Sequence, residues 1–288
     1  MPSRNGPPNP LRLGYQSPAI MSPTPFPEKL RSIQERNSSL LCVGLDPDPA
    51  RLLGRHLPSF LQEIIEATVD IVCAYKPNLA FFEALGTGGM SALIESLAMV
   101  PPEIPIIADA KRGDIGNTAE FYARTLFEEY DFDAATVNPF GGEDAVRPFL
   151  DYRHKGVFIW CRGSNPGSAD IQDRVLDDGR RVFELVAELA KTWDEHGNMG
   201  LVVGANYPED LARVRAICPE APILIPGVGA QAGDLAAAVG AALDSNNAGI
   251  IINSSRQILY ASSDRHFAQA ARKTALALRN EINRVRGA

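Results

Sequence analysis

The chain of 288 residues is poor in the residues that form cross-links or bind metal ions, with only four cysteines and four histidines. The cysteines form no CxxC pair, which argues against a disulfide framework or a zinc site. They are Cys42, Cys73, Cys161 and Cys218, and three of them lie in apolar runs. The histidines show no HxH or HExxH spacing, so the sequence predicts no protein-bound metal ion. We therefore expect buried free thiols and a cytoplasmic location.

Long apolar runs and an excess of positive charge are also absent from the sequence. No run approaches the roughly 20 apolar residues that a membrane-spanning helix needs. Lys and Arg number 28 against 35 Asp and Glu, which gives a formal net charge of -7. A chain with this balance is not expected to bind nucleic acid or an anionic membrane. Its hydrophobic fraction of 45% is sufficient for a sizeable core.

The N-terminal segment, residues 1–26, differs from the rest of the chain in composition. It contains seven prolines and has neither a periodic apolar pattern nor the hydrophobic core of a signal peptide. We expect a flexible, disordered arm there and a single catalytic domain over residues 27–288. Met21 precedes the first helical pattern, and we take a translation start at this residue as a hypothesis.

Eight short apolar runs follow one another along the remaining chain. Their ranges are 40–45, 71–75, 104–109, 134–137, 157–161, 201–204, 223–225 and 249–252. Amphipathic segments follow most of these runs, a pattern typical of parallel strands covered by helices. Eight such units close a (β/α)8 barrel, whereas an open doubly wound sheet uses fewer strands. The sequence thus predicts an α/β fold of the TIM-barrel class.

The third run ends in the segment Asp109-Ala-Lys111-Arg-Gly-Asp114, which carries an unusual concentration of charge. Asp109 and Lys111 are two positions apart, so along a strand their side chains share a face. Charges at the end of an interior strand are costly unless they are paired or functional. A structural salt bridge would explain Asp109 and Lys111 alone. It does not explain a second acid, Asp114, three residues further on.

Polar residues also follow most of the other apolar runs, and in a barrel these strand ends meet at one mouth. They are Asp46, Lys76, Asn138, Ser164, Gln231 and Arg256. Asn138 is better explained as a helix cap. Glycines at 227, 229 and 233, together with Arg256, favour a phosphate site after the seventh and eighth strands. The polar stretch 162–180 is either a lid or a plain surface excursion.

These residues resemble a known family. The segment 109–118 is closely similar to the active-site signature of the orotidine 5'-phosphate decarboxylases, in the bacterial branch in which Arg-Gly follows the lysine. Similar motifs occur in the expected order at 41–46, 75–78, 163–167, 226–231 and 253–256. The resemblance implies a carboxy-lyase that converts orotidine 5'-phosphate to uridine 5'-phosphate, the last step of de novo pyrimidine synthesis, without a cofactor or metal.

The resemblance also implies a role for each matched residue. Lys111 would protonate C6 of the pyrimidine, and Asp109 would sit beside the departing carboxylate and keep Lys111 charged. Asp114, Ile115 and Thr118 would reach into the site of a neighbouring subunit, so the active unit would be a homodimer. The other matched residues would bind the substrate: Asp46 and Lys76 the ribose, Ser164 the pyrimidine, and Gln231 and Arg256 the 5'-phosphate.

Two alternative functions remain open at this stage. A metal-dependent sugar-phosphate decarboxylase or aldolase would share the barrel and the Asp-x-Lys-x-x-Asp arrangement. Its metal would need an acid at the end of the second strand, where this chain has Lys76. The other alternative is a non-catalytic barrel that binds a phosphorylated nucleotide. Such a protein would not need the charges of Asp109, Lys111 and Asp114.

Overall fold

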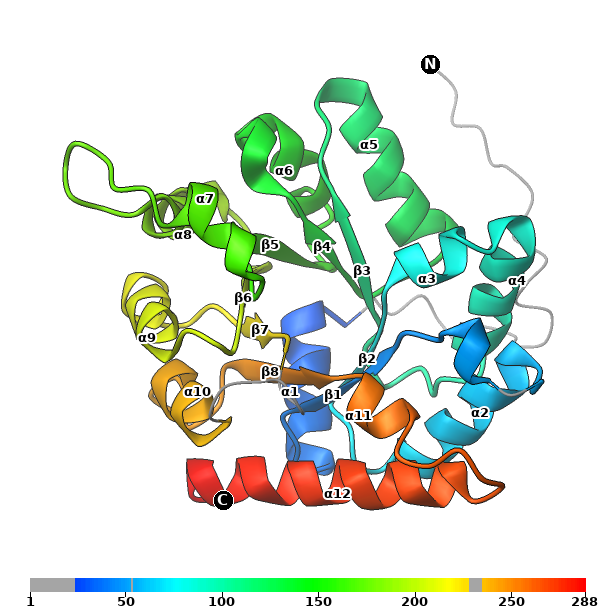
Figure 1. The fold of residues 1–288 in the computed structure, drawn as a ribbon. Helices are drawn as coiled ribbons and strands as arrows, with labels where there is room; N and C mark the ends of the chain where they lie inside the picture. Colours follow the sequence, from blue (N-terminus) through cyan, green and yellow to red (C-terminus); the bar gives the residue numbers. More distant parts are fainter. Residues whose placement is uncertain (1–23, 53, 228–234) are drawn as a thin grey trace.

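The computed structural model describes residues 24–52, 54–227 and 235–288, and in this part of the chain eight parallel strands surround the core (Figure 1). The strands are β1 (Leu41–Leu45), β2 (Ala74–Pro77), β3 (Ile107–Arg112), β4 (Ala134–Val137), β5 (Gly156–Arg162), β6 (Met199–Val203), β7 (Ile223–Ile225) and β8 (Ile250–Ser254). Bridges between Tyr75 and Ile106 and between Asn78 and Asp109 join β2 to β3. They complete the circuit, so the predicted (β/α)8 barrel is confirmed.

Helices surround this barrel. They are α1 (Phe26–Arg36), α2 (Leu57–Thr68), α3 (Leu79–Glu83), α4 (Gly86–Leu97), α5 (Gly116–Arg124), α6 (Glu143–Leu150), α7 (Ala169–Gln172), α8 (Val182–Trp193), α9 (Pro208–Ile217), α10 (Leu235–Ala242), α11 (Arg256–Leu259) and α12 (Phe267–Arg286). Short 3-10 turns at Pro49–Arg51, Pro139–Gly141 and Pro166–Ser168 and a π-helical turn at Thr125–Glu129 complete the set. None of the helices in the described ranges has the length and apolarity needed to span a membrane.

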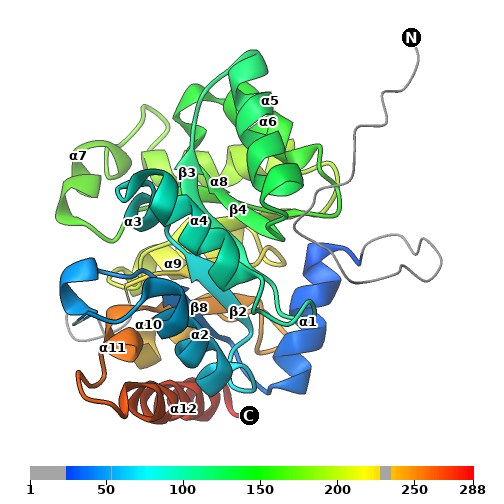
Figure 2. The ribbon, with the colours of Figure 1, turned by 90° about the vertical axis from the view of Figure 1, so that its right-hand side faces the viewer.

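The helices pack through the apolar faces that their sequences provide. One face of α12 is buried along the length of the helix, at Phe267, Ala271, Ala275, Leu278 and Ile282, which recur at helical spacing. Burial of such a stripe, rather than intrinsic helix propensity, supplies most of the stability of a helix in a protein. Figures 1 and 2 agree in placing α5 beside α6, next to β3 and β4.

Helix α1 packs across the barrel near the start of β5. The ring of Phe26, its first residue, meets the edge of Phe158 at a centroid distance of 5.7 Å. A Cβ atom at Gly156 would lie only 2.3 Å from the Phe26 ring, so glycine is needed for this close approach. Most of the proposed N-terminal arm, residues 1–23, lies outside the described residues.

Most strand boundaries follow the predicted apolar runs to within two residues, but the second and third strands are displaced toward the C-terminus. The second run was placed at 71–75, whereas β2 spans Ala74–Pro77. Strands β4 and β7 have the predicted bounds. The third run was expected to end at Asp109, but β3 continues to Arg112 because its pairing with β4 shifts register and resumes between Arg112 and Val137. The strand therefore carries Lys111 as well as Asp109 to the mouth of the barrel.

Candidate active site

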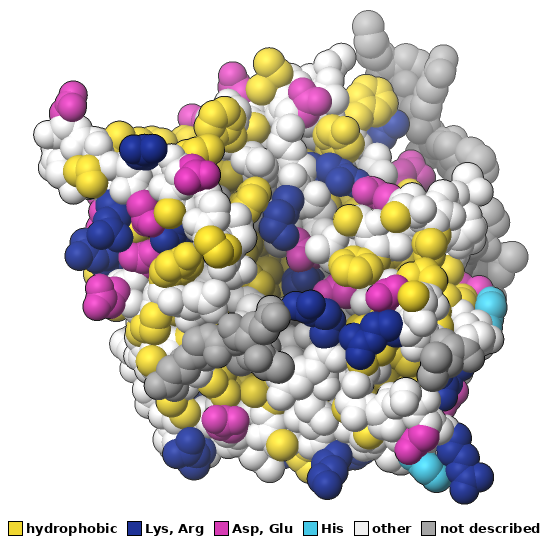
Figure 3. Space-filling model, in the orientation of Figure 1, with side chains coloured by type: hydrophobic (Ala, Val, Ile, Leu, Met, Phe, Trp, Pro, Cys, Tyr) yellow, Lys and Arg dark blue, Asp and Glu magenta, His cyan; other side chains and the backbone are white. Residues whose placement is uncertain are grey.

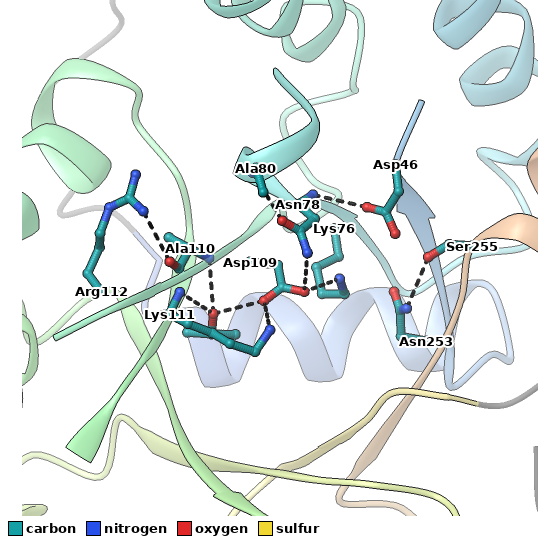
Figure 4. A network of polar contacts seen from close by, with 11 residues as sticks. Asp46, Lys76, Asn78, Ala80, Asp109, Ala110, Lys111, Arg112, Asn253 and Ser255 are labelled. Carbon is teal, nitrogen blue, oxygen red and sulfur yellow. Dashed lines mark hydrogen bonds and ion pairs between the residues drawn. The ribbon is translucent and has the colours of Figure 1, made fainter. Parts of the chain in front are cut away.

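The carboxyl ends of β1, β2 and β3 bring together four residues that the sequence predicts as site residues: Asp46, Lys76, Asp109 and Lys111 (Figure 4). Figure 3 shows Lys, Arg, Asp and Glu side chains gathered near the middle of this face of the molecule. The position agrees with the general location of active sites in this fold, at the face formed by the strand carboxyl ends.

Asp109 is held between two ammonium groups. Lys76 Nζ donates a hydrogen bond to Oδ2 of Asp109 at 2.7 Å, and Lys111 Nζ donates to Oδ1 at 2.5 Å. The side chains of Lys76 and Asp109 are only 3% and 9% exposed, whereas that of Lys111 is 34% exposed. The predicted contact between Asp109 and Lys111 is thus confirmed. Lys111 is the member of this array that a ligand in the mouth could reach.

The two lysines determine the charge state of this array. Burial by itself would raise the pKa of Asp109, but the charges and hydrogen bonds of Lys76 and Lys111 hold it well below its usual value. Burial would likewise lower the pKa of Lys76, yet the carboxylates of Asp109 and Asp46 raise it above the ordinary lysine value. Asp109 and Lys76 are therefore both charged at neutral pH.

Asp46 is half-buried at the end of β1, where it faces the next strand. Its Oδ1 accepts a hydrogen bond of 3.0 Å from the backbone N–H of Asn78. On the other side, a Cβ at Gly44 would lie 1.9 Å from Ser255 Oγ and 3.1 Å from Asp46 Oδ2. Glycine at position 44 thus allows the turn after β8 to approach β1 and brings Ser255 beside Asp46.

Three further polar residues belong to this mouth but were not among the predicted site residues. The Asn78 side chain donates to Asp109 Oδ2 at 3.5 Å, and Thr136 donates to Asp109 Oδ1 at 3.1 Å. Asn253, 6% exposed, donates to Ser255 Oγ, while its Oδ1 is buried and accepts no hydrogen bond within the described part of the chain. Asn78 and Asn253 stand in motifs already noted, whereas Thr136 is hidden inside an apolar run.

Ser164 lies where the loops after β5, β6 and β7 meet. Its carbonyl oxygen accepts a hydrogen bond from Asn206 Nδ2 at 3.1 Å. A Cβ at Gly204 would lie 2.7 Å from Ser164 Cα, and one at Gly227, where φ is +90°, would lie 3.5 Å from Ser164 Cβ. The Ser164 side chain is half-buried beside the start of the glycine-rich turn.

The excursion after β5 is anchored at its base by a buried arginine. Arg162 Nε donates to Asp210 Oδ2 and Nη1 donates to Ser168 Oγ, both at 2.9 Å. The guanidinium also lies over the ring of Tyr207, 4.1 Å from its centroid. Figure 1 shows the more distant part of the excursion, between α7 and α8, projecting away from the barrel. The base of the excursion is therefore fixed, and its distal part projects from the barrel.

The predicted phosphate residues are described only in part. Arg256 is exposed at the start of α11, directly after β8. Gln231 lies outside the described residues, as do Gly229 and Gly233. Asn138, which was predicted to be a cap, does accept the N–H of Phe140 at 3.0 Å and so caps the 3-10 turn after β4.

Asp114, Ile115 and Thr118 lie on the exposed side of the turn into α5. Asp114 Oδ1 accepts the N–H of Ile115 at 2.8 Å. The recorded hydrogen bonds and ion pairs of Asp109 and Lys111 with described residues do not include Asp114. Within one chain, Asp109 and Lys111 are thus in contact, whereas Asp114 is not bonded to either of them.

The arrangement does not resemble a metal centre. Across residues 24–52, 54–227 and 235–288, no three His, Cys, Asp or Glu side chains are grouped so that they could hold a metal ion. At the end of β2, Lys76 contacts Asp109, and this places a positive charge where the metal-dependent alternative requires an acid.

Comparisons with known proteins agree with this geometry. A model of the orotidine 5'-phosphate decarboxylase / HUMPS family matches residues 39–271. The orotidine 5'-phosphate decarboxylase of Ralstonia pickettii (strain 12J) is 50% identical over 269 residues, which are 91% of this chain and 99% of that protein. That of Roseiflexus sp. (strain RS-1) is 52% identical over 266 residues, 90% of this chain and 97% of that protein.

A solved structure gives the same result. The OMP decarboxylase of Leishmania donovani superimposes with a TM-score of 0.82 at 42% identity, covering 92% of this chain and 100% of that one. The family match over residues 39–271 spans all eight strands of the barrel. The chain therefore belongs to the orotidine 5'-phosphate decarboxylase / HUMPS family.

Proposed function

We propose that the mouth of this barrel decarboxylates orotidine 5'-phosphate to uridine 5'-phosphate, the activity for which the relatives are named. The observation that carries the proposal is the array in which Asp109 is held between Lys76 and Lys111. A structural ion pair needs one cation, and here a second cation, partly exposed, points from the same carboxylate toward the mouth. A purely nucleotide-binding barrel would have no use for this arrangement.

Lys111 is the proposed general acid. When the C6–carboxylate bond breaks, carbon dioxide leaves and the electron pair stays on C6, in the plane of the ring, where no adjacent carbonyl delocalises it. A fixed ammonium stabilises this charge electrostatically and then transfers its proton to C6. Water returns a proton to Lys111 after product formation. Asp109 orients the ammonium through its Oδ1 and lies beside the departing carboxylate.

Substrate binding is assigned to the residues around this array. Asp46 and Lys76 would bind the ribose. The Oδ1 of Asn253, which accepts no hydrogen bond from the described residues, provides one more acceptor for a hydroxyl group. Ser164 would contact the pyrimidine. Arg256, together with Gln231, would bind the 5'-phosphate, because a guanidinium matches phosphate oxygens in geometry and charge. Phosphate binding far from C6 can contribute to the chemical step through closure of the site.

The active unit in this proposal is a homodimer in which Asp114, Ile115 and Thr118 complete the partner's site. Support comes from the exposure of large apolar side chains on the same turn and helix. Ile115 is 59% exposed and Phe121 56% exposed. Exposed apolar side chains that lie close together often mark a contact between proteins.

The remaining parts of the proposal concern location and domain extent. The four cysteines are free and buried, in keeping with a reducing cytoplasm. We assign catalysis to residues 27–288 and treat residues 1–26 as an extension, because the family model begins at residue 39. A variant that starts at Met21 should keep the turnover number of the full chain, and a loss of turnover would place residues 1–20 in the catalytic unit.

Turnover of orotidine 5'-phosphate tests the proposed reaction directly. The purified chain is treated with a chelator and mixed with the nucleotide, and the loss of orotate absorbance is followed. We expect full turnover without added metal. Activity that is lost with the chelator and restored by a divalent cation would favour the metal-dependent alternative. Binding of the nucleotide without turnover under either condition would favour a non-catalytic barrel.

A further inference from the structure

The catalytic segment of β3 contains a pronounced bulge. Ile107 pairs with Ala134 and Ala108 with Ala135, but the next pair joins Arg112 to Val137. Three residues of β3, numbers 109–111, therefore stand opposite one residue of β4, number 136. Bulges of this kind redirect side chains and are common next to active sites.

Lys111 adopts an unusual backbone conformation within this bulge. Its φ is +43°, in the left-handed region that residues other than glycine seldom occupy. Such a conformation persists only when the surrounding structure holds it in place. The ladder to β4 does not supply this support, because its pairing is interrupted here.

Thr136, the single residue opposite the bulge, replaces the missing ladder bonds with its side chain. Its Oγ1 accepts the backbone N–H groups of Ala110 and Lys111, each at 3.0 Å, and donates its own proton to Asp109 Oδ1 at 3.1 Å. A hydroxyl has one donor and two acceptor sites, so its capacity is completely used. The side chain is fully buried, and no bulk water can take its place.

We propose that Thr136 is a positioning residue for the decarboxylation, acting through Asp109 and Lys111. Its hydroxyl fixes the left-handed turn at Lys111 and the rotation of the Asp109 carboxylate at the same time. The Lys111 ammonium is thereby held at the mouth, 2.5 Å from Asp109 Oδ1 and 5.9 Å from the centroid of the Trp160 ring. The inference rests on the roles proposed above for Asp109 and Lys111.

An apolar residue of the same shape would disrupt this arrangement. Valine at 136 would leave two part-buried N–H groups without this acceptor. It would also remove one of the two described donors to Oδ1 of Asp109, the other being Lys111 Nζ. The bulge would then rearrange to find other partners, and Lys111 Nζ would move with it. A displacement of about 1 Å at a catalytic group can lower the rate about 100-fold.

Thr136→Val and Thr136→Ser provide the test, with Thr68→Val as the matched control. Thr68 is another fully buried threonine, whose hydroxyl bonds to Ile64 O and Tyr75 Oη outside the mouth. Each protein is assayed for kcat with orotidine 5'-phosphate, for the Kd of uridine 5'-phosphate and for Tm.

We expect Thr136→Val to lower kcat about 100-fold while product affinity stays near the wild-type value. Thr136→Ser, which keeps the hydroxyl, should retain most of the activity. Thr68→Val should lower Tm but leave kcat unchanged. If Thr136→Val does not fold, Thr136→Ala replaces it with the same expectation.

Other results would overturn the inference. An unchanged kcat in the folded variant without the hydroxyl, or an equal loss in Thr136→Ser, would show that the hydroxyl does not position the array. A loss of product affinity in proportion to kcat would indicate general disruption of the mouth. If the proposed function itself is wrong, the unaltered chain will not turn over orotidine 5'-phosphate, and this outcome is distinct from the results above.

Discussion

The Nζ atom of Lys76 lies 2.7 Å from Oδ2 of Asp109, and both side chains are more than nine-tenths buried. Two opposite charges that are buried together stabilise each other. Removal of either one destabilises the folded protein, because the charge that remains is buried without its main partner. The pair links β2 to β3 through Oδ2 of the carboxylate. The other oxygen, Oδ1, accepts the hydrogen bond from Lys111.

Removal of Lys76 should therefore affect stability as well as activity. We expect Lys76→Met to lower the free energy of unfolding by about 3 kcal/mol, because the partly exposed Lys111 is then the one described cation that still pairs with Asp109. The double variant Lys76→Met/Asp109→Leu removes both buried charges and should be more stable than the single variant. Urea unfolding at pH 7 measures both. A double variant less stable than Lys76→Met would contradict this account of the pair.

Asp109 should contribute to stability in a pH-dependent way. Its folded-state pKa lies below the unfolded value of about 3.9, so its contribution is complete above that pH and is lost as the pH falls toward the folded pKa. Asp109→Asn resembles the protonated acid. The difference in unfolding free energy between wild type and Asp109→Asn should therefore be largest at pH 7 and smaller at pH 3. If the difference in unfolding free energy did not change with pH, the conclusion that Asp109 is ionised and paired in the folded protein would be wrong.

Subunit mixing tests whether Asp114 acts across a dimer interface. Lys111→Ala and Asp114→Ala chains are co-expressed with different tags, and the heterodimer is purified. If Asp114 serves the partner's site, one of the two sites contains both native residues, so about half of the wild-type activity returns. A heterodimer of Lys111→Ala and Asp109→Ala is the control and should stay inactive. Equal inactivity of both heterodimers would place Asp114 in the same site as its own lysine.

Arg256 should matter only when the substrate carries a phosphate. We expect Arg256→Ala to lower kcat/KM for orotidine 5'-phosphate about 10- to 100-fold, the value of a charge-assisted hydrogen bond. The rate with orotidine, which lacks the phosphate, should not change. Arg36→Ala, at an exposed arginine on α1 that pairs with Glu103, serves as the control and should affect neither substrate. Equal losses with both substrates would assign Arg256 a different role.

The sequence predicts the barrel and the array correctly because both depend on local patterns. Eight apolar runs identify the strands. The alternation of side chains along a strand predicts the contact between Asp109 and Lys111, although the structure forms this contact within a bulge in which Lys111 is left-handed. Strand ends that meet at one face then bring in Asp46 and Lys76. These steps need only the period of a strand and the closure of the barrel.

Other features depend on contacts that local patterns do not carry. Thr136 stands in the apolar run 134–137 and looks like an ordinary strand residue, since β-branched side chains favour strands. Its role arises from a register shift between β3 and β4, and the sequence of one strand alone does not indicate how that strand pairs with its neighbour. The buried Oδ1 of Asn253, which has no hydrogen-bond partner among the described residues, likewise becomes evident only in the folded structure. The end of β3 was misplaced for the same reason.

Replacement of Lys111 by alanine, with turnover and product binding measured on the same preparation, tests the central claim most directly. The account predicts that kcat for orotidine 5'-phosphate falls at least about 1,000-fold, because both the electrostatic stabilisation of the C6 carbanion and its proton donor are lost. Uridine 5'-phosphate should still bind. A Lys111→Ala protein that retains most of its turnover would show that another group protonates C6.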